Sequence, residues 1–278
     1  MQAALILDEN KFEYQSPADM IRIIQTTVDS GSADEYFLYF YGVTHGHLRE
    51  ISRAFFLSDL RCTILFATEN SLGALICKIL PRGRLYALTF NLWGEVMLKI
   101  MLIPGQTCDS IDWFYGTRFH LGDVRSKEGY RALGPATRGA RTGASAAWPS
   151  VVMEVGYSEA LDFLRLDAKW WLINSAGNTR FVMIVQLMTD PFAIHIECWA
   201  MVALDGPQTI QVATQTPACV QLFDIETEGT VISASRELRI PYSSIFDEPS
   251  ENAQDAVFTN AELSSFALRM FRQLSDFY

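Results

Sequence analysis

A run of apolar residues that contains a single acidic side chain is the feature that most constrains the fold of this chain. Residues 150–156 read Ser-Val-Val-Met-Glu-Val-Gly, the nearly continuous apolar pattern of a strand that is buried on both faces. Apolar residues then recur at helical spacing from Leu161 to Trp171, and a second apolar run begins at Phe181. Strand, helix and strand in this order predict a βαβ-like crossover, and therefore an α/β fold.

Two helices are expected in the N-terminal part of the chain. Ser16, followed by a proline, has the residue type of an N-cap, and the apolar residues of 47–57 fall on one helical face. Residues 61–121 are rich in β-branched and aromatic residues. We therefore expect several strands there, including 85–92 and 96–103.

The C-terminal part is expected to contain a loop, a strand and a final helix. Residues 131–147 are rich in Gly, Ala, Arg and Thr, a composition typical of a mobile loop. Apolar and polar residues alternate over 192–201, which predicts a strand. Thr259 and Glu262 have the spacing of a capping box at the start of an amphipathic helix.

Composition excludes some classes of protein. The 278 residues include 22 Lys or Arg and 32 Asp or Glu, so the net charge of −10 argues against indiscriminate nucleic-acid binding by the whole surface. A local basic strip is still compatible with this charge. Hydrophobic residues make up 49% of the chain, enough for a sizeable folded core.

Cysteine usage and the apolar segments bear on the compartment. The five cysteines are an odd number without a CxxC pair, which argues against a disulfide framework and a zinc knuckle. The first residues lack the basic region of a signal peptide, and the apolar stretch 85–104 contains Glu95 and Lys99. We therefore expect an intracellular protein, cytoplasmic or nuclear, that does not enter a membrane.

Glu154 is the only charged residue in the apolar run at 150–156. An unpaired carboxylate in a buried strand would be costly, and a bound metal ion would offset this cost. An arginine partner or a hydrogen bond to neighbouring backbone would offset it as well. The sequence gives these two interpretations equal weight.

The segment 126–188 resembles a family of fungal proteins related to the PD-(D/E)XK nucleases, of the restriction-endonuclease-like superfamily. The residues concerned are SKEGYRALGPATRG and, further on, WPSVVMEVGYSEALDFLRLDAKWWLINSAGNTRFVMIV. The resemblance implies a core of a helix, three strands, a helix and a strand, in which helices flank a central mixed sheet. It implies this core at 44–205, an N-terminal extension with one helix at 1–43, and an acidic C-terminal extension with a terminal helix at 206–278.

The same resemblance implies hydrolysis of phosphodiesters in DNA or RNA with Mg²⁺ or Mn²⁺ as cofactor. Glu154 matches the family's metal-binding Glu. Tyr130 stands where the family has a metal-binding Asp, and Gly156 stands where it has a Lys. Asp123 or Glu128 would have to supply the second acid, because a divalent ion at a phosphodiester calls for oxygen ligands.

Two further residues enter through the resemblance. Lys169 lies on the helix after Glu154 and could take the role of the missing Lys, although a solvated helix residue is the favoured interpretation. Glu50, with His47 before it, is the candidate accessory acid or metal ligand, and a solvated helix start is favoured there too. These departures leave a catalytically inactive pseudo-nuclease, which binds nucleic acid or protein, as the alternative function.

A basic segment precedes Glu154. Between Arg118 and Arg141 there are six basic residues and only two acidic ones, a pattern suited to phosphate contacts. An ordinary solvated loop that balances the acidic tail has equal weight. The residues expected to hold phosphates are Arg125, Lys127, Arg131 and Arg138.

Three polar residues outside the resemblance are assigned simpler roles. His195 and Glu197 are expected on the solvent-facing side of an edge strand, and Gln186 is expected to be a hydrogen-bonded core amide. The net charge and the acidic tail also suit a third function, an interaction protein that does not bind nucleic acid.

Overall fold

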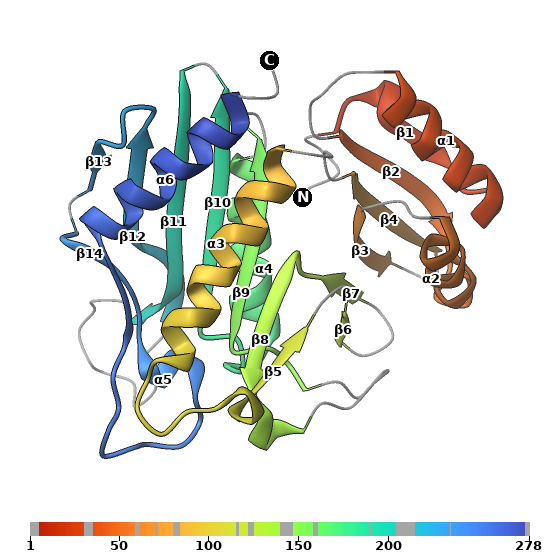
Figure 1. Cartoon of the computed structure of the whole chain (residues 1–278). Helices are drawn as coiled ribbons and strands as arrows, with labels where there is room; N and C mark the ends of the chain where they lie inside the picture. The colour runs from red at the N-terminus through yellow and green to blue at the C-terminus, as the bar shows by residue number, and fades with distance from the viewer. Residues whose placement is uncertain are drawn as a thin grey trace. The chain divides into compact units, whose positions relative to one another are not determined.

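The computed structural model describes residues 6–30, 36–58, 62–69, 72–79, 84–114, 117–121, 125–139, 147–157, 161–189, 191–203, 215–233 and 235–275. Internal contacts divide the chain into two units, each of which is described by itself (Figure 1). Unit 1 comprises Met1–Arg82, Gly116–Gly129 and Thr142–Ala146. Unit 2 comprises Gly83–Tyr115, Tyr130–Arg141 and Ala147–Tyr278.

Unit 1 contains a six-stranded sheet in the order β1-β2-β4-β3-β7-β6, in which only β1 and β2 pair in parallel. The helices α1 (Pro17–Asp29) and α2 (His47–Ser58) share one core with the sheet. A 3₁₀ turn, η2 (Asp8–Asn10), precedes the first strand. The strands are β1 (Lys11–Glu13), β2 (Tyr36–Val43), β3 (Cys62–Glu69), β4 (Leu72–Ile79), β6 (Arg118–Leu121) and β7 (Arg125–Glu128).

Both helices expected in this part of the sequence are confirmed. The Ser16 hydroxyl accepts a hydrogen bond from the Asp19 N–H at 3.1 Å, which caps α1. Met20 and Ile24 of α1 and Ile51 of α2 are buried in the core against β2, β3 and β4. Burial of these apolar faces stabilises the helices more than their own propensity does.

Unit 2 contains a seven-stranded sheet in the order β13-β12-β11-β10-β9-β8-β5. Only β9 and β10 pair in parallel, and all other neighbours are antiparallel. The strands are β5 (Ile111–Phe114), β8 (Arg131–Pro135), β9 (Val151–Tyr157), β10 (Phe181–Thr189), β11 (Phe192–Ala203), β12 (Gln215–Glu226) and β13 (Val231–Ile232).

Helices cover both faces of this sheet. Helix α4 (Leu161–Asn174) lies behind the sheet in Figure 1, whereas α3 (Arg84–Met101) and α6 (Asn260–Ser275) lie in front of it. Helix α4 connects the parallel strands β9 and β10, so the crossover expected from the sequence is confirmed. The chain is thus a mixed α/β protein in which helices flank mixed sheets.

Short elements complete unit 2. The strands β14 (Glu237–Ile240) and β15 (Ala256–Thr259) form a separate antiparallel pair, with the short helix α5 (Tyr242–Ile245) between them in sequence. The 3₁₀ turns η3 (Cys108–Ser110) and η4 (Ala136–Arg138) lie before β5 and after β8.

The strands expected at 85–92 and 96–103 are wrong, because this segment forms the helix α3. Its buried residues recur every four positions, which is a helical period, and this spacing outweighs their aromatic and β-branched character. The buried residues at this spacing are Leu88, Leu92, Val96 and Ile100. None of the helices in the described ranges is long and apolar enough to cross a membrane.

The loop expected at 131–147 is also wrong in its first part. Residues 131–135 form β8, which lies between β5 and β9, and Ala132 and Leu133 are buried. Small residues suit this position because β8 is covered on its faces as well as paired at both edges. Residues 140–146 lie outside the described part of the chain.

The ends of two helices agree with the sequence. Helix α4 stops at Asn174, and Gly177 adopts a positive φ of 82° just after it, a conformation that glycine accommodates without strain. At α6, the Thr259 hydroxyl accepts from the Glu262 N–H at 3.2 Å, and the Glu262 carboxylate accepts from the Thr259 N–H at 2.9 Å. The predicted capping box is therefore confirmed.

Candidate functional site

Five polar side chains share one face of the seven-stranded sheet. Glu154 of β9 and Glu197 of β11 align with the same residue of β10. His195 lies two residues before Glu197 on β11, in the next row on this face. It aligns with Gln186 on one side and with Asp224 on the other. Aligned residues of neighbouring strands project to the same face, and so do residues two apart along one strand. We call this set the polar face: Glu154, Gln186, His195, Glu197 and Asp224.

Helix α4 covers the polar face. The indole Nε1–H of Trp171 donates to Oε1 of Glu154 at 2.7 Å, so Glu154 has a hydrogen-bond donor within the core. Both side chains are buried, with exposures of 0% for Trp171 and 1% for Glu154. This hydrogen bond offsets part of the cost of removing the carboxyl group from water.

Glu197 lies at the centre of a hydrogen-bond network. The Arg165 side chain of α4 donates to its Oε1 from Nε at 3.0 Å and from Nη2 at 2.5 Å, and the indole Nε1–H of Trp199 donates to Oε2 at 2.7 Å. Burial raises the pKa of Glu197, but hydrogen bonds from His195, Arg165 and Trp199 outweigh it and hold the pKa at about 2. Glu197 is therefore a buried carboxylate that stays charged.

His195 bridges two carboxylates. Its Nδ1 lies 2.5 Å from Oδ1 of Asp224, and its Nε2 lies 3.2 Å from Oε1 of Glu197. With acceptors at both ring nitrogens, the imidazolium is the form that donates to both. Burial acts to lower the pKa of His195, but the hydrogen bonds and charges of Glu197 and Asp224 raise it above its ordinary value.

The expectation of a solvent-facing edge strand for His195 and Glu197 is wrong. Strand β11 lies between β10 and β12, and both side chains are buried. The alternation of polar and apolar residues is real, but Arg165 of α4 and Asp224 of β12 compensate the polar positions in place of water. Gln186 is buried as expected, with an exposure of 2%.

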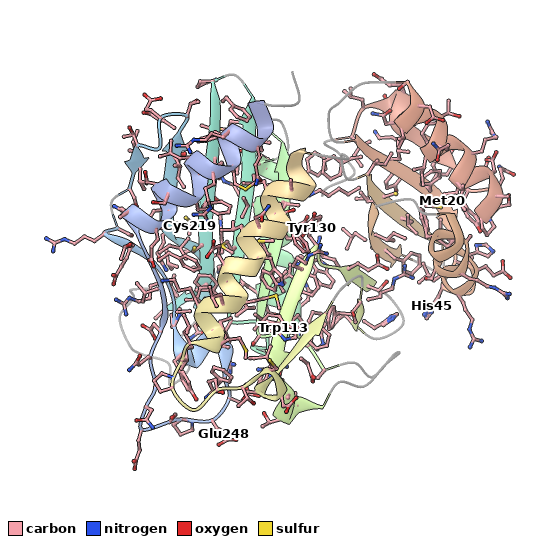
Figure 2. All side chains as sticks on the ribbon, viewed as in Figure 1. Met20, His45, Trp113, Tyr130, Cys219 and Glu248 are labelled. Atoms are coloured by element: carbon pink, nitrogen blue, oxygen red, sulfur yellow. The ribbon has the colours of Figure 1, made fainter. Side chains whose placement is uncertain are left out.

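The residue that the resemblance aligns with a metal-binding Asp, Tyr130, makes a contact inside the fold. Tyr130, labelled in Figure 2, is buried, and its hydroxyl lies 2.7 Å from Oγ1 of Thr89 on α3. Two neutral hydroxyls share this hydrogen bond, and neither is an anionic metal ligand.

The remaining candidate catalytic residues lie in different places. Lys169 is exposed on α4, and its Nζ lies 5.6 Å from the centroid of the Trp199 ring. Glu50 is exposed on α2 of unit 1. Asp123 lies outside the described residues.

Glu128 belongs to unit 1, whereas Glu154 belongs to unit 2. The Glu128 carboxylate accepts from Nε and Nη2 of Arg118, at 3.1 and 2.8 Å. Burial raises the pKa of Glu128, while the charge and the hydrogen bond of Arg118 act in the opposite direction. This pair is held within one sheet, because Arg118 and Glu128 are cross-strand partners on β6 and β7.

The basic residues expected at phosphates have contacts inside the protein. Lys127 is buried, with an exposure of 4%. Arg131 donates to the Tyr130 carbonyl at 3.3 Å, and its guanidinium lies 4.9 Å from the centroid of the Tyr130 ring. Arg138 forms an ion pair with Asp247 at 2.6 Å. The side chain of Arg125 lies outside the described part of the structure.

The described residues do not fit a divalent metal ion at Glu154. Within the described ranges, no group of three or more His, Cys, Asp or Glu side chains is arranged to hold a metal. Mg²⁺ requires several oxygen ligands in octahedral geometry. Glu154 accepts from Trp171, and the residue that the resemblance aligns with the second acid is Tyr130, so these two positions supply one carboxylate only.

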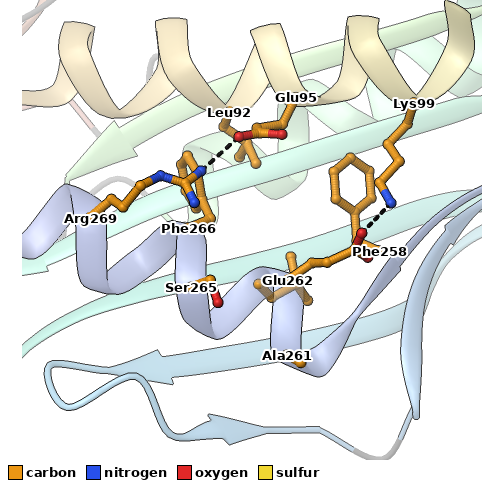
Figure 3. Close-up of a pocket in the computed structure, with 10 residues that line it drawn as sticks. Leu92, Glu95, Lys99, Phe258, Ala261, Glu262, Ser265, Phe266 and Arg269 are labelled. Carbon is orange, nitrogen blue, oxygen red and sulfur yellow. Dashed lines mark hydrogen bonds and ion pairs between the residues drawn. The ribbon is translucent and has the colours of Figure 1, made fainter. Parts of the chain in front are cut away.

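A groove between α3 and α6 lies on the opposite side of the sheet from α4 (Figure 3). Its volume is about 250 Å³, and its apolar lining includes Leu92, Phe258 and Phe266. Two ion pairs connect the helices along it, Lys99 with Glu262 at 2.5 Å and Arg269 with Glu95 at 2.7 Å. The acidic and basic groups of the groove are thus already paired with one another.

Comparisons of the chain with family models, with curated proteins and with solved structures find no match. The assignment of a function therefore depends on the residues and the geometry described above.

Proposed function

We propose that this chain is a PD-(D/E)XK-related protein whose metal centre is degenerate, and that it acts as a binding module for nucleic acid or protein. The order of elements in unit 2 supports the relationship. Apart from the strands of unit 1, the chain proceeds through α3, β5, β8, β9, α4 and β10, a helix, three strands, a helix and a strand. Four of these elements are neighbouring strands of one mixed sheet.

The observation that carries the loss of the metal centre is the contact between Tyr130 and Thr89. A phenol and a threonine hydroxyl, 2.7 Å apart and buried, stand where the motif requires a carboxylate. A tyrosine in this position contributes packing and a neutral hydrogen bond, and it does not supply the second carboxylate of the motif. Recognition of a partner by the folded surface needs no such pair.

Metal-dependent hydrolysis of phosphodiesters is the second candidate. The burial of the Glu154 carboxyl group on a central strand favours it, because acidic side chains are seldom fully buried and those that are occur often at functional sites. In that case Mg²⁺ or Mn²⁺ would need Glu154 together with a second acid. Lys169 would then support the attacking water.

A titration of Mn²⁺ decides between the two. We expect no saturable binding that depends on Glu154, and no cleavage of single- or double-stranded DNA or RNA, in the wild type or in Glu154→Gln. The amide oxygen of the introduced glutamine retains an acceptor for Trp171, so the variant should fold. Glu228→Gln, at an exposed turn residue, is the control for the change in charge. Saturable binding and cleavage that are both lost in Glu154→Gln, but kept in the control, would establish the nuclease instead.

The partner class is tested by the salt dependence of binding. If the partner is a nucleic acid, the protein should bind a labelled oligonucleotide with an affinity that falls steeply as the salt concentration rises, because each phosphate contact releases counterions. No binding at low salt would argue against a nucleic-acid partner. This measurement is independent of Glu154 and of the metal.

A further inference from the structure

Two arginines of unit 2 hold one carboxylate between them. Arg138 of η4 donates to Asp247 from Nε at 2.7 Å and from Nη2 at 2.6 Å, which is the bidentate geometry that guanidinium groups form with oxyanions. Arg180, just before β10, donates to the same carboxylate from Nη1 at 2.8 Å. Asp247 follows α5 in the acidic C-terminal part of the chain.

Main-chain carbonyls keep the two guanidinium groups in place. Nη1 of Arg138 donates to the carbonyls of Trp148 and Asn178, at 2.7 and 3.2 Å. Nε of Arg180 donates to the carbonyl of Ser244 at 3.4 Å. These contacts do not involve Asp247, so the two cations are positioned for an oxyanion even without its carboxylate.

The two arginines offer more charge and more donors than Asp247 uses. Two guanidinium groups face one negative charge. The Asp247 carboxylate has only two oxygens to share among the donors. In the described part of the chain, Nη2 of Arg180 is buried and has no hydrogen-bond partner. A phosphate group carries about −1.5 to −2 charges and three terminal oxygens, which matches both the charge and the surplus donor.

We propose that Arg138 and Arg180 form a binding site for a phosphate group, which the Asp247 carboxylate occupies in the free protein. The ligand is a phosphate monoester that displaces this carboxylate, and the terminal phosphate of a nucleic acid and the phosphate of a small molecule are its two sources. The site does not involve Glu154 or a metal ion. It therefore goes beyond the proposed function.

The displacement is tested with Asp247→Asn, which removes the competing charge and keeps the shape of the side chain. The probe is inorganic phosphate, titrated calorimetrically at constant low ionic strength. We expect phosphate to bind the variant about tenfold more tightly than the wild type, the effect of roughly one charge-assisted hydrogen bond. Glu248→Gln, at the exposed neighbouring residue labelled in Figure 2, removes the same charge and should leave the affinity as in the wild type.

A second substitution tests whether Arg180 binds the phosphate. In the Asp247→Asn background, Arg180→Gln should abolish the gain in phosphate binding. Equal phosphate affinity in wild type, Asp247→Asn and Glu248→Gln would overturn the proposal, and so would a gain that survives Arg180→Gln. If Asp247→Asn does not fold, the wild type still serves: phosphate should raise its unfolding temperature, and Arg180→Gln should abolish that rise.

The source of the phosphate is resolved with a matched pair of oligonucleotides. A short oligonucleotide with a 5′-phosphate should bind Asp247→Asn more tightly than the same oligonucleotide with a 5′-hydroxyl if a terminal monoester is the ligand. Equal binding of the two, lost in Arg180→Gln, would show that a backbone diester with one charge and two terminal oxygens is sufficient, and would overturn the assignment to a monoester. Binding of inorganic phosphate without either oligonucleotide assigns it to small phosphate compounds. These measurements leave Glu154 unchanged and use no Mn²⁺, so their outcome is separate from that of the Mn²⁺ titration that tests the metal centre.

Discussion

Replacement of Glu197 by Gln should destabilise unit 2 because both carboxylate oxygens are used. Oε1 accepts from Arg165 and faces His195, while Oε2 accepts from Trp199. A glutamine side chain has one oxygen and one NH₂ group. In either orientation, its NH₂ group would face an N–H donor, that of Arg165 or that of Trp199. The variant also leaves the charge of Arg165 without its partner on β11.

The size of the effect follows from the pKa of Glu197, which is about 2 compared with an ordinary value of 4.5. Since one pKa unit corresponds to about 1.4 kcal/mol, the folded surroundings favour the charged form by roughly 3 kcal/mol. Arg165 is 37% exposed, so water solvates it in the variant and reduces the loss. We expect the free energy of unfolding at neutral pH to fall by about 2–3 kcal/mol.

The lowered pKa also gives the direction of the pH dependence. The stabilisation by charged Glu197 is fully present above about pH 4.5 and is lost as the pH falls through about 2. The difference between wild type and Glu197→Gln should therefore shrink as the pH falls below 4.5. Urea unfolding followed by tryptophan fluorescence at a series of pH values measures it, because Trp199 contacts the substituted group.

The control for this series is Glu228→Gln, which makes the same change in charge at an exposed position. It should stay within about 0.5 kcal/mol of the wild type, as exposed substitutions usually do. A Glu197→Gln variant that is as stable as this control at neutral pH would refute the reasoning. A loss of stability that does not change with pH would show that packing, and not the charge of Glu197, stabilises the network.

Three further predictions test other contacts. The contribution of His195 to stability is fully present below its ordinary pKa of 6.5 and is lost as the pH rises through its raised pKa in the folded protein. In NMR, its ring resonances should therefore titrate above pH 6.5 in the wild type. They should titrate at a lower pH in Asp224→Asn, which lacks one of the charges that raise this pKa. Trp171→Phe removes a hydrogen bond to buried Glu154 and should lower the free energy of unfolding, measured in urea, by about 1–3 kcal/mol. Ser16→Ala removes the cap of α1 and should cost unit 1 about 1 kcal/mol in the same assay.

Local signals in the sequence were sufficient for several elements of the fold. The apolar run at 150–156, the helix after it and the apolar run from Phe181 correspond to β9, α4 and β10. A capping residue with a defined hydrogen bond marks the starts of α1 and α6, and such bonds are formed by neighbours in sequence. The failure at α3 has a different cause: composition favoured strands, while the four-residue spacing of buried residues favoured a helix, and the spacing was decisive.

The candidate site was predictable only where a residue contradicted its local surroundings. Glu154 could be identified because it is a charge in an apolar run, and the structure shows it buried. His195 and Glu197 could not, because polar residues that alternate with apolar ones are the ordinary pattern of a solvated strand. Their burial depends on Arg165, 32 residues from Glu197, and on Asp224, 29 residues from His195. Contacts at such separations leave no periodic trace in a single sequence.

The hydrogen bonds of the polar face explain why its acids need not form a catalytic site. Helix α4 provides the donor for Glu154 through Trp171 and the donor for Glu197 through Arg165, so one helix satisfies acids on two strands. A shift of α4 along the sheet would break both of these hydrogen bonds, whose acceptors are buried. The polar face therefore fixes the position of α4. In the described part of the chain Nη2 of Arg180 has no hydrogen-bond partner, so an anion that reached it would gain a contact that the acids of the polar face cannot offer.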